Sequence, residues 1–513
     1  MFSRSNILKL SLFATGLSGI VAEYILATLA TYFLGNSVFQ WTMVLSVMLF
    51  SMGLGSRISK QIETRLLERF ILIEFTLSIL VSFSALAAYV VAAHFAYTSL
   101  VIYGFSVIIG ALIGMEIPLV IRLNDEFEEL KVNVSNVMEK DYYGSLLGGV
   151  FFVFFGLPYL GLTYTPFLLG TVNFVVAILL LFSLKSTLKP NWKKRLYGTT
   201  LAVAIIIGAG AFFAKPIILF GEQTRYKDKV IYTDQSQYQN LVVTQYKGNY
   251  WFYINGNQQL STLDEWMYHE PLVHPAMKLH ANPENVLILG GGDGCAAREV
   301  LKYESVQHIK LVDLDPKVTE LAKTHPIFTE LNENALENEK VEVLNGDAYT
   351  YLEATQEYFD VIVIDFPDPK SIELGRLYSY EFYRMCYKQL RPNGVIVVQS
   401  GSPYYATKAF ACIEKTIAAA GFQTIPIHNQ VLTLGQWGWT IGAKSIPKDT
   451  LKPLLRQMTF DGMETRWINN DAMSHITSFG KSLVKLDTAK IEVNRIHNPV
   501  LSAYYRQGNW QFY

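Results

Sequence analysis

The first 220 residues consist mostly of long apolar stretches, and this feature constrains the fold of the chain more than any other. Seven stretches reach the length of a membrane span, about 20 apolar residues each. They cover roughly residues 7–34, 38–56, 70–93, 97–121, 144–162, 164–184 and 197–220. Helices buried in a soluble protein usually keep a polar face, which disfavours that alternative. The sequence therefore predicts an α-helical membrane domain of about seven spans over residues 1–220, with the lipid bilayer as its partner.

Lysine and arginine residues are confined to alternate connections between these stretches. They precede the first stretch and follow the second, fourth and sixth, and the other three connections carry none. The positive-inside rule then places the N-terminus in the cytoplasm. Because seven is an odd number of spans, the remainder of the chain would then lie on the opposite side of the membrane, outside the cytoplasm. If one stretch does not cross, such as the proline-interrupted AFFAKPIILF, the remainder would lie in the cytosol.

Composition excludes several other classes of protein. A length of 513 residues fits two or three domains, and the net charge of −1 without a basic tract argues against nucleic acid as a partner. The three cysteines, Cys295, Cys386 and Cys412, have no metal-ligand spacing and cannot form a disulfide framework. We therefore expect no metal site.

From about Gly221 the composition becomes that of a soluble α/β protein. YQNLVVTQYKGNYWFYINGNQQLS alternates apolar and polar residues around Lys-Gly and Asn-Gly turns, which predicts a small β-hairpin domain over residues 221–283. Over residues 284–513, seven β-rich runs alternate with helical patterns: NVLILG, IKLVDLD, VEVLNGD, FDVIVIDF, GVIVVQS, FQTIPIHN and GWTIGAK. This alternation predicts a mostly parallel, doubly wound sheet with a helical C-terminal extension.

Glycines and carboxylates gather where these predicted strands end. A glycine-rich turn follows the first run and opens a helix, as ligand-binding turns of open α/β sheets do. Aspartates stand at or near the end of each of the next three runs. The candidate residues are Gly290, Gly291, Gly292, Asp293, Gly294, Asp313, Asp347, Asp365 and Asp368. All of them are expected at the carboxyl edge of one sheet, where such sheets bind ligands.

Asp293 lies inside the glycine turn and indicates the charge of the ligand. A dinucleotide would place its pyrophosphate at this helix N-terminus, where an aspartate would repel it. The turn therefore suits a nucleoside with a positively charged tail better than it suits NAD.

These motifs together resemble the spermidine synthase family of polyamine aminopropyltransferases. The matching segments are YQN, NGNQQLSTLDEWMYHEPLVHP, LILGGGDG, LVDLD, NGDAY, DFPDP, YSYEFYR and GQWGW, within residues 225–445. The whole chain is similar to a bacterial subgroup with a multi-spanning N-terminal region. The resemblance implies a small β domain, a methyltransferase-like Rossmann domain, and a dimer or tetramer. It also implies a nucleoside sulfonium donor, decarboxylated S-adenosylmethionine, acting as co-substrate with no further cofactor, and a polyamine acceptor.

The resemblance also implies a role for each matching residue. Gly290 and Gly292 would form the donor turn, and Asp293 would hold the aminopropyl ammonium of the donor, with Gln259 nearby. Asp313 would bind the ribose and Asp347 the adenine amine. Asp365 would be the general base. The residues implied for the acceptor site are Gln239, Tyr268, His269 and Asp368.

This chemistry explains why two aspartates three residues apart are needed. An amine with a pKa near 10 is mostly protonated at neutral pH, and it must lose a proton before it can attack the carbon beside a sulfonium. One carboxylate can take that proton, and a second can hold the distal ammonium and fix the line of attack. The prolines of DFPDP stiffen the turn between the two acids.

The sequence departs from the family on the acceptor side. Soluble relatives often carry a tyrosine where Leu432 stands, and two serines where Phe366 and Pro367 stand. Both changes predict a more apolar acceptor pocket. Putrescine, giving spermidine, is the first acceptor we expect.

Two alternatives to this function stay open. One is a methyltransferase that uses S-adenosylmethionine itself, whose extra carboxylate the acidic pocket should disfavour. The other is a polyamine transporter or sensor, motivated by Glu23, Glu74 and Glu116 within apolar stretches, where carboxylates are costly and often functional. For location, we expect a multi-pass inner-membrane protein with its catalytic domain on the cytosolic face, because the expected donor is made in the cytosol.

Overall fold

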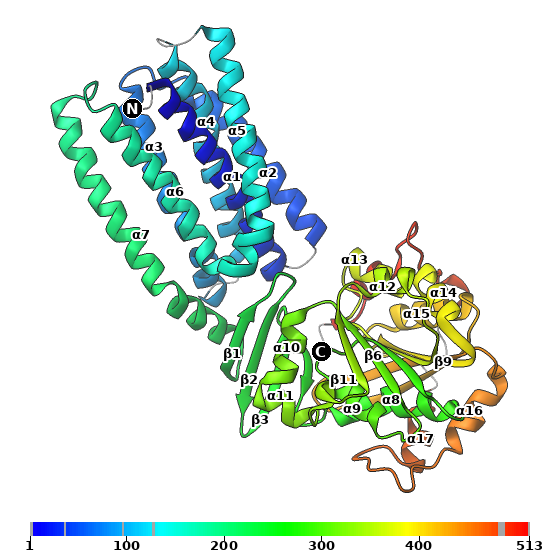
Figure 1. Cartoon of the computed structure of the whole chain (residues 1–513). Helices are drawn as coiled ribbons and strands as arrows, with labels where there is room; N and C mark the ends of the chain where they lie inside the picture. Colours follow the sequence, from blue (N-terminus) through cyan, green and yellow to red (C-terminus); the bar gives the residue numbers. More distant parts are fainter. Residues whose placement is uncertain (1–3, 35–36, 95–96, 126–128, 481–487, 511–513) are drawn as a thin grey trace. The chain divides into compact units, whose positions relative to one another are not determined.

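The structure, a computed structural model, describes residues 4–34, 37–94, 97–125, 129–480 and 488–510. The chain divides into two compact units, Met1–Asn240 and Leu241–Tyr513. The first unit is helical apart from one strand near its end, and the second unit combines strands and helices (Figure 1). The predicted domain boundaries after residues 220 and 283 stay predictions.

The first unit contains seven long helices among its described residues. They are α1 (Arg4–Leu34), α2 (Ser37–Ser59), α3 (Leu66–His94), α4 (Thr98–Asn124), α5 (Leu130–Phe151), α6 (Gly161–Ser183) and α7 (Pro190–Arg225). A π-helical segment, Phe152–Leu160, joins α5 to α6, and Gly161 after it has a φ of +61°. Within the described part of the chain, six segments are long and apolar enough to cross a membrane, and one of them, Leu130–Ser183, contains both α5 and α6. The predicted number of seven spans stays a prediction.

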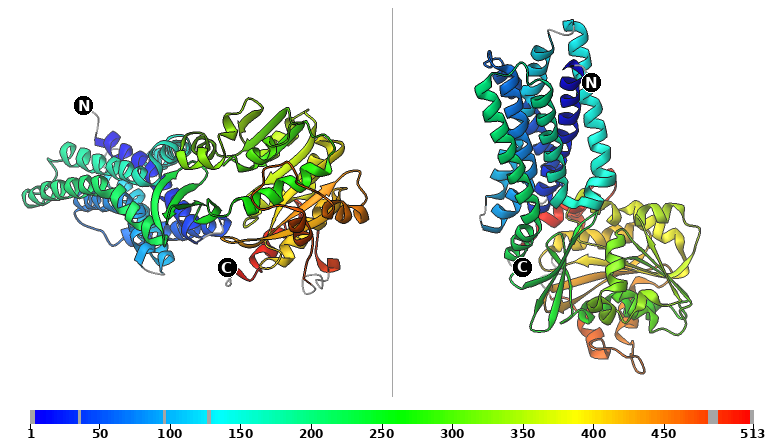
Figure 2. Two further views of the ribbon diagram at one scale, coloured as in Figure 1. Left: turned by 90° about the horizontal axis from the view of Figure 1, so that it is seen from below. Right: turned by 60° about the vertical axis from the view of Figure 1, so that its left-hand side comes forward.

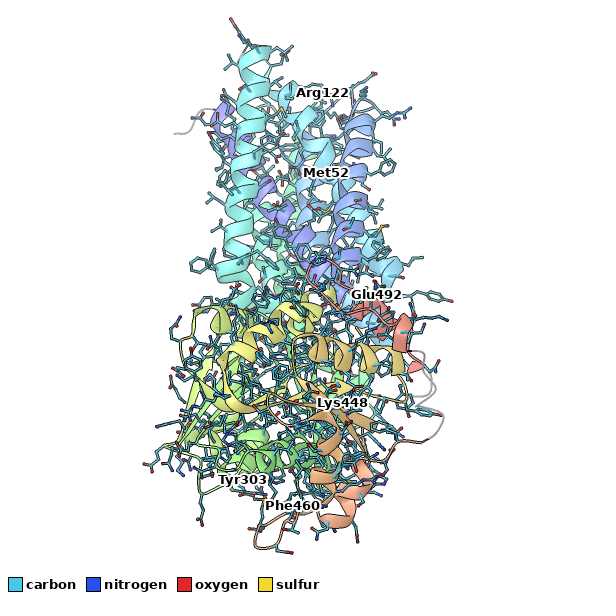
Figure 3. The ribbon with its side chains drawn as sticks, turned by 90° about the vertical axis from the view of Figure 1, so that its right-hand side faces the viewer. Met52, Arg122, Tyr303, Lys448, Phe460 and Glu492 are labelled. Carbon is cyan, nitrogen blue, oxygen red and sulfur yellow. The ribbon has the colours of Figure 1, made fainter. Side chains whose placement is uncertain are left out.

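The long helices run side by side, with α1 packed against α2, α3, α4, α5 and α6 (Figure 1). Helices α2 and α4 approach each other closely, because Gly114 lies against the backbone of Met52 without room for a Cβ. Near the end of α4, Arg122 donates hydrogen bonds to the carbonyl oxygens of Ser59 (2.8 Å) and Ile62 (2.9 Å). Figure 3 labels Met52 and Arg122 at two levels of this bundle.

Antiparallel hairpins follow the helices, as the turn sequences predict. Strand β1 (Lys229–Gln235) precedes β2 (Asn240–Tyr246), β3 (Asn249–Ile254) and β4 (Asn257–Ser261). β2 pairs with β3 and β3 with β4, both antiparallel. Lys247 and Gly248 have φ values of +48° and +82°, and Asn255 and Gly256 have +50° and +77°. Two successive positive φ angles make the tight two-residue turn that suits the twist of a hairpin.

A seven-stranded sheet forms the centre of the second unit, in the order β10-β11-β9-β8-β5-β6-β7. Its strands are β5 (Asn285–Gly290), β6 (His308–Asp313), β7 (Val341–Asn345), β8 (Phe359–Asp365), β9 (Leu390–Gly401), β10 (Gln423–Val431) and β11 (Gly435–Ala443). All seven predicted runs are strands. β5 to β9 are parallel, and β10 and β11 form an antiparallel hairpin beside β9. The predicted Rossmann-like architecture is confirmed.

Helices cover both faces of this sheet (Figure 2). One apolar core joins the sheet to α8, α9, α16 and α17, and the other joins it to α12, α14, α15 and α18. The helices of the second unit are α8 (Trp266–Leu279), α9 (Cys295–Leu301), α10 (Pro316–Thr324), α11 (Pro326–Leu331), α12 (Ala348–Ala354), α13 (Ile372–Gly375), α14 (Tyr380–Gln389), α15 (Thr407–Ala419), α16 (Lys448–Arg456), α17 (Asn470–Ile476) and α18 (Leu501–Arg506).

Candidate active site

The glycine turn after β5 brings the backbone close to the end of β8. Gly290, Gly291 and Gly294 have φ values of +81°, +64° and +86°, a region that side-chain-bearing residues rarely adopt. Gly290 pairs with Asp365 across the two parallel strands, and a Cβ at Gly290 would overlap the carbonyl oxygen of Asp365. This close approach sets the turn beside the predicted base.

Asp313, at the end of β6, forms the other wall of this turn. Its Oδ2 accepts a hydrogen bond from the backbone N–H of Gly292 (3.1 Å), and its Oδ1 accepts one from Asp315 (2.9 Å). A Cβ on Gly292 would lie 2.7 Å from the Asp313 carboxyl group. Burial raises the pKa of Asp313 to about 6, although these two hydrogen bonds oppose the rise.

Asp365 has the environment that a general base needs. The hydroxyl of Tyr268, on α8, donates a hydrogen bond to its Oδ1 at 2.6 Å. Burial raises the pKa of Asp365 to about 6, and the charge of His269 and the Tyr268 hydrogen bond limit that rise. A carboxylate with this pKa is ionised at neutral pH and is more basic than an exposed aspartate. Burial, and then the Asp365 carboxylate, raise the pKa of Tyr268 well above its usual value, so the tyrosine stays a hydrogen-bond donor.

His269 lies between acidic groups. Its Nδ1 is 2.8 Å from Glu265 Oε2, and its Nε2 is 4.0 Å from Asp293 Oδ1. Burial disfavours the charged ring, but the hydrogen bond to Glu265 and the charges of Asp293 and Asp365 outweigh burial and raise the pKa of His269 to about 9. The ring is therefore an imidazolium at neutral pH.

These groups are close enough to hold a cation. His269, Asp293 and Asp365 each place one potential metal-ligating atom within 4.8 Å of the others. A protonated imidazole has no free lone pair for a metal, so with its pKa near 9 His269 is a poor ligand at neutral pH. The two carboxylates suit an organic ammonium or sulfonium better.

A buried ion pair that the sequence analysis did not single out supports His269. Both carboxylate oxygens of Glu265 accept hydrogen bonds from Arg298, each at 2.9 Å. Glu265 precedes α8 and Arg298 lies on α9, so the pair connects the helix that carries Tyr268 with the helix that follows the glycine turn. A lone arginine in the apolar segment CAAREVL was the only local signal for it.

Asp368 is held by two side chains that the sequence analysis also missed. Its Oδ1 accepts a hydrogen bond from Gln399 Nε2 (2.8 Å), and its Oδ2 accepts one from the Tyr505 hydroxyl (2.5 Å). The Tyr378 hydroxyl donates to the side-chain oxygen of Gln399 at 3.0 Å and lies 3.1 Å from the carbonyl oxygen of Pro367. Hydrogen bonds from Gln399, Tyr505 and Tyr378 therefore hold the turn that carries Asp368.

Two predicted site residues make other contacts, and a third lies in the first unit. Asp347 accepts a hydrogen bond from the N–H of Thr350 at the start of α12 and pairs with Arg376. The Gln259 amide bonds carbonyl oxygens of its own strand. Gln239 belongs to the first unit. Their expected roles in ligand binding stay predictions.

Phe366 is buried in an apolar core, where its ring contacts Tyr378 and Phe382 at centroid distances of 6.2 and 5.7 Å. The same ring borders the glycine turn, because a Cβ at Gly290 would lie 3.1 Å from it. Its expected contribution to a more apolar acceptor pocket stays a prediction.

Comparison with known proteins finds relatives over nearly the whole chain. Residues 265–452 match the model of the spermine/spermidine synthase domain. The chain is 41% identical to polyamine aminopropyltransferase 2 of Aquifex aeolicus, over 98% of this chain and 99% of the relative. It is 37% identical to the polyamine aminopropyltransferase of Oceanobacillus iheyensis, over 99% of this chain and 98% of the relative. A solved spermidine synthase in complex with the transition state analogue AdoDATO is 30% identical, with a TM-score of 0.46 over 50% of this chain and 87% of that chain.

A Rossmann-like sheet carries the carboxylates at its carboxyl edge, where open α/β sheets bind ligands. The full-length relatives show which family has this arrangement of motifs. The chain belongs to the spermine/spermidine synthase family, and it is a polyamine aminopropyltransferase.

Proposed function

We propose that the protein transfers the aminopropyl group of decarboxylated S-adenosylmethionine to a diamine, putrescine first, and releases 5′-methylthioadenosine. The observation that carries this proposal is the Asp365 carboxylate, with a pKa of about 6, held by Tyr268 beside the charged His269 and Asp293. A base of this kind serves an amine nucleophile, and the acids around it suit two cationic substrates.

The reaction requires one proton transfer and one substitution. Asp365 takes a proton from the acceptor ammonium, which frees the lone pair of the nitrogen. That nitrogen attacks the CH₂ carbon beside the sulfonium of the donor. A new C–N bond forms, the C–S bond breaks, and its electron pair stays on sulfur, which becomes the neutral thioether. Asp368 would hold the distal ammonium, so that the near nitrogen lies in line with the C–S bond.

Product analysis tests this function and its nearest rival. The purified protein would receive either decarboxylated S-adenosylmethionine or S-adenosylmethionine, each with putrescine, cadaverine, spermidine or agmatine. Mass spectrometry should find methylthioadenosine and an amine heavier by one aminopropyl group, with the decarboxylated donor only. An amine heavier by one methyl group, formed from S-adenosylmethionine, would contradict the proposal and identify a methyltransferase.

A sensor with a non-catalytic domain makes a different prediction. Asp365→Asn should keep donor binding, measured by calorimetry, and lose turnover. If the wild-type protein binds both ligands and never forms product, the domain is a sensor.

We propose that the helices α1 to α7 lie in the inner membrane and that the catalytic unit faces the cytosol. The proposal is supported by the six apolar segments and by the lysine and arginine residues in alternate connections. A reporter fused after the last residue tests it, because alkaline phosphatase is active only in the periplasm and a fluorescent protein matures in the cytosol. An active phosphatase fusion would contradict the cytosolic placement. The expected dimer or tetramer is measured by light scattering in detergent.

A second candidate function, passage of an amine through the helical unit, is favoured by its carboxylates. Glu74 on α3 and Glu116 on α4 are fully buried. Thr15 donates a hydrogen bond to Glu74 at 3.4 Å, but the other Glu74 oxygen and both Glu116 oxygens have no hydrogen-bond partner among the described residues. Polyamine flux into vesicles should fall when Glu23, Glu74 and Glu116 become glutamine. Replacement of the exposed Glu63 is the control, and unchanged flux in the triple variant would refute passage.

A further inference from the structure

The carboxylate of Asp368 is fixed by two donors from distant parts of the second unit. Gln399 Nε2 binds one oxygen at 2.8 Å, and the Tyr505 hydroxyl binds the other at 2.5 Å. An ionised carboxylate offers about four lone-pair sites. Each oxygen can therefore accept one further hydrogen bond while its orientation is fixed by the protein. This arrangement suits an ammonium that must be held in one place.

The side chain of Tyr505 is held in place by its neighbours. It lies on α18 and is only 5% exposed. The ring of Trp510 packs against its ring at a centroid distance of 4.5 Å, and Trp510 Nε1 donates a hydrogen bond to the Tyr505 carbonyl oxygen at 2.8 Å. Because the ring is held in this way, the Tyr505 hydroxyl makes a charge-assisted hydrogen bond of defined direction to the Asp368 carboxylate.

The segment that leads into α18 is hydrogen-bonded to the short helical turns that follow β8. The side-chain amide of Asn494 donates hydrogen bonds to the carbonyl oxygens of Gly375 (2.8 Å) and Tyr378 (3.1 Å). The N–H of Leu501, the first residue of α18, donates to Asn494 Oδ1 at 3.3 Å. The helix that carries Tyr505 is thereby held against the part of the chain that carries Asp368.

We propose that Tyr505 is a positioning residue for the amine acceptor. Its hydroxyl orients the Asp368 carboxylate, which in turn binds the distal ammonium of a diamine. The assignment rests on the proposed function, because it concerns the acceptor half of the same site. Tyr505 does not touch the reacting atoms, so its effect is confined to acceptors that carry a second ammonium.

Kinetics of the full-length Tyr505→Phe variant test this assignment, since the change removes only the hydroxyl and keeps the ring against Trp510. Loss of one hydrogen bond to a charged group should raise the KM for putrescine roughly tenfold, with kcat and the donor KM unchanged. With 1-aminobutane, which lacks the distal ammonium, kcat/KM should not change. In an Asp368→Asn background, the same replacement should have no further effect on the putrescine KM. Tyr504→Phe, one residue away, is the matched control, because the Tyr504 hydroxyl lies 3.4 Å from the N–H of Glu492.

Each other outcome contradicts the assignment. An unchanged KM for putrescine, or equal losses with putrescine and 1-aminobutane, would show that Tyr505 serves only the stability of α18. If the wild-type protein transfers no aminopropyl group to any amine, the proposed function fails and the assignment fails with it. If the wild-type protein is active and the Tyr505→Phe variant has the same KM for putrescine, the assignment of Tyr505 fails while the proposed function stands.

Discussion

Replacement of the base Asp365 by asparagine should stabilise the folded protein while it abolishes activity. Burial raises the pKa of Asp365 from an ordinary 3.8 to about 6, so folding disfavours its charged form. At about 1.4 kcal/mol per pH unit, this rise corresponds to about 3 kcal/mol. The penalty is fully present above pH 6, where the carboxylate is charged in the folded protein. It disappears below pH 3.8, where the group is protonated in both folded and unfolded chains.

Asparagine carries no charge at any pH, so it should relieve this penalty. It also keeps a side-chain oxygen to accept the hydrogen bond from Tyr268. At pH 8 the melting temperature of the variant should exceed that of the wild type by about 6 °C as an upper bound, at roughly 2 °C per kcal/mol for a large domain. The difference should shrink toward zero between pH 6 and pH 4. Turnover should fall by about 10² to 10⁴, the usual loss on removal of a general base.

Thermal unfolding of both full-length proteins in detergent, at pH 4, 5, 6, 7 and 8, measures this difference. Asp449→Asn, which replaces an exposed aspartate in the first turn of α16, is the matched control and should not raise the melting temperature at pH 8. A variant that is no more stable than the wild type at pH 8 would refute the argument. So would a gain of the same size at pH 4 and pH 8, because desolvation of a charge would then not be its cause.

Two further changes probe the donor side and the electrostatics of the site. Gly292→Ala should raise the KM for the donor, because a Cβ there would lie 2.7 Å from the Asp313 carboxyl group. Gly346→Ala is the control and should leave the donor KM unchanged, because its Cβ would enter open space. Equal donor KM values in the wild type and both variants would contradict this prediction. His269→Gln removes a positive charge that lowers the pKa of Asp365. The acidic limb of the pH profile of kcat/KM should then move to higher pH, and an unmoved limb would show that the imidazolium does not act on the base.

Local sequence patterns predicted the sheet and the position of the glycine turn and Asp365 at its carboxyl edge. The β-rich runs and their turn residues identified every strand from β5 to β11, because such strands carry their own apolar pattern. Gly290 and Asp365 could be placed together, since both end parallel strands and the ends of such strands lie at one edge of the sheet. The resemblance to a family supplied roles that spacing alone could not.

The acceptor side could not be predicted from local patterns. Tyr505 meets Asp368 across 137 residues, and nothing near Tyr505 in the sequence distinguishes it from Tyr504. The partnership of Glu265 with Arg298 likewise exists only once α8 and α9 are packed. The contact of the Phe366 ring with Phe382 on α14 likewise joins segments that are separate in the sequence. Contacts of this kind depend on tertiary packing, which periodicity does not encode.

The order of the strands also has a consequence for how the chain reaches its active state. β5, β6 and β7 are neighbours in both sequence and space, so they can pair early through short connections. The other edge of β5, with the apolar run VLIL, stays open until β8 pairs with it. Open apolar edges are where partly folded chains aggregate. Because Asp365 is the last residue of β8, the strand that delivers the base is also the strand that covers this edge. A mutation that slows this pairing should therefore reduce the yield of folded enzyme before it affects the turnover of the molecules that fold.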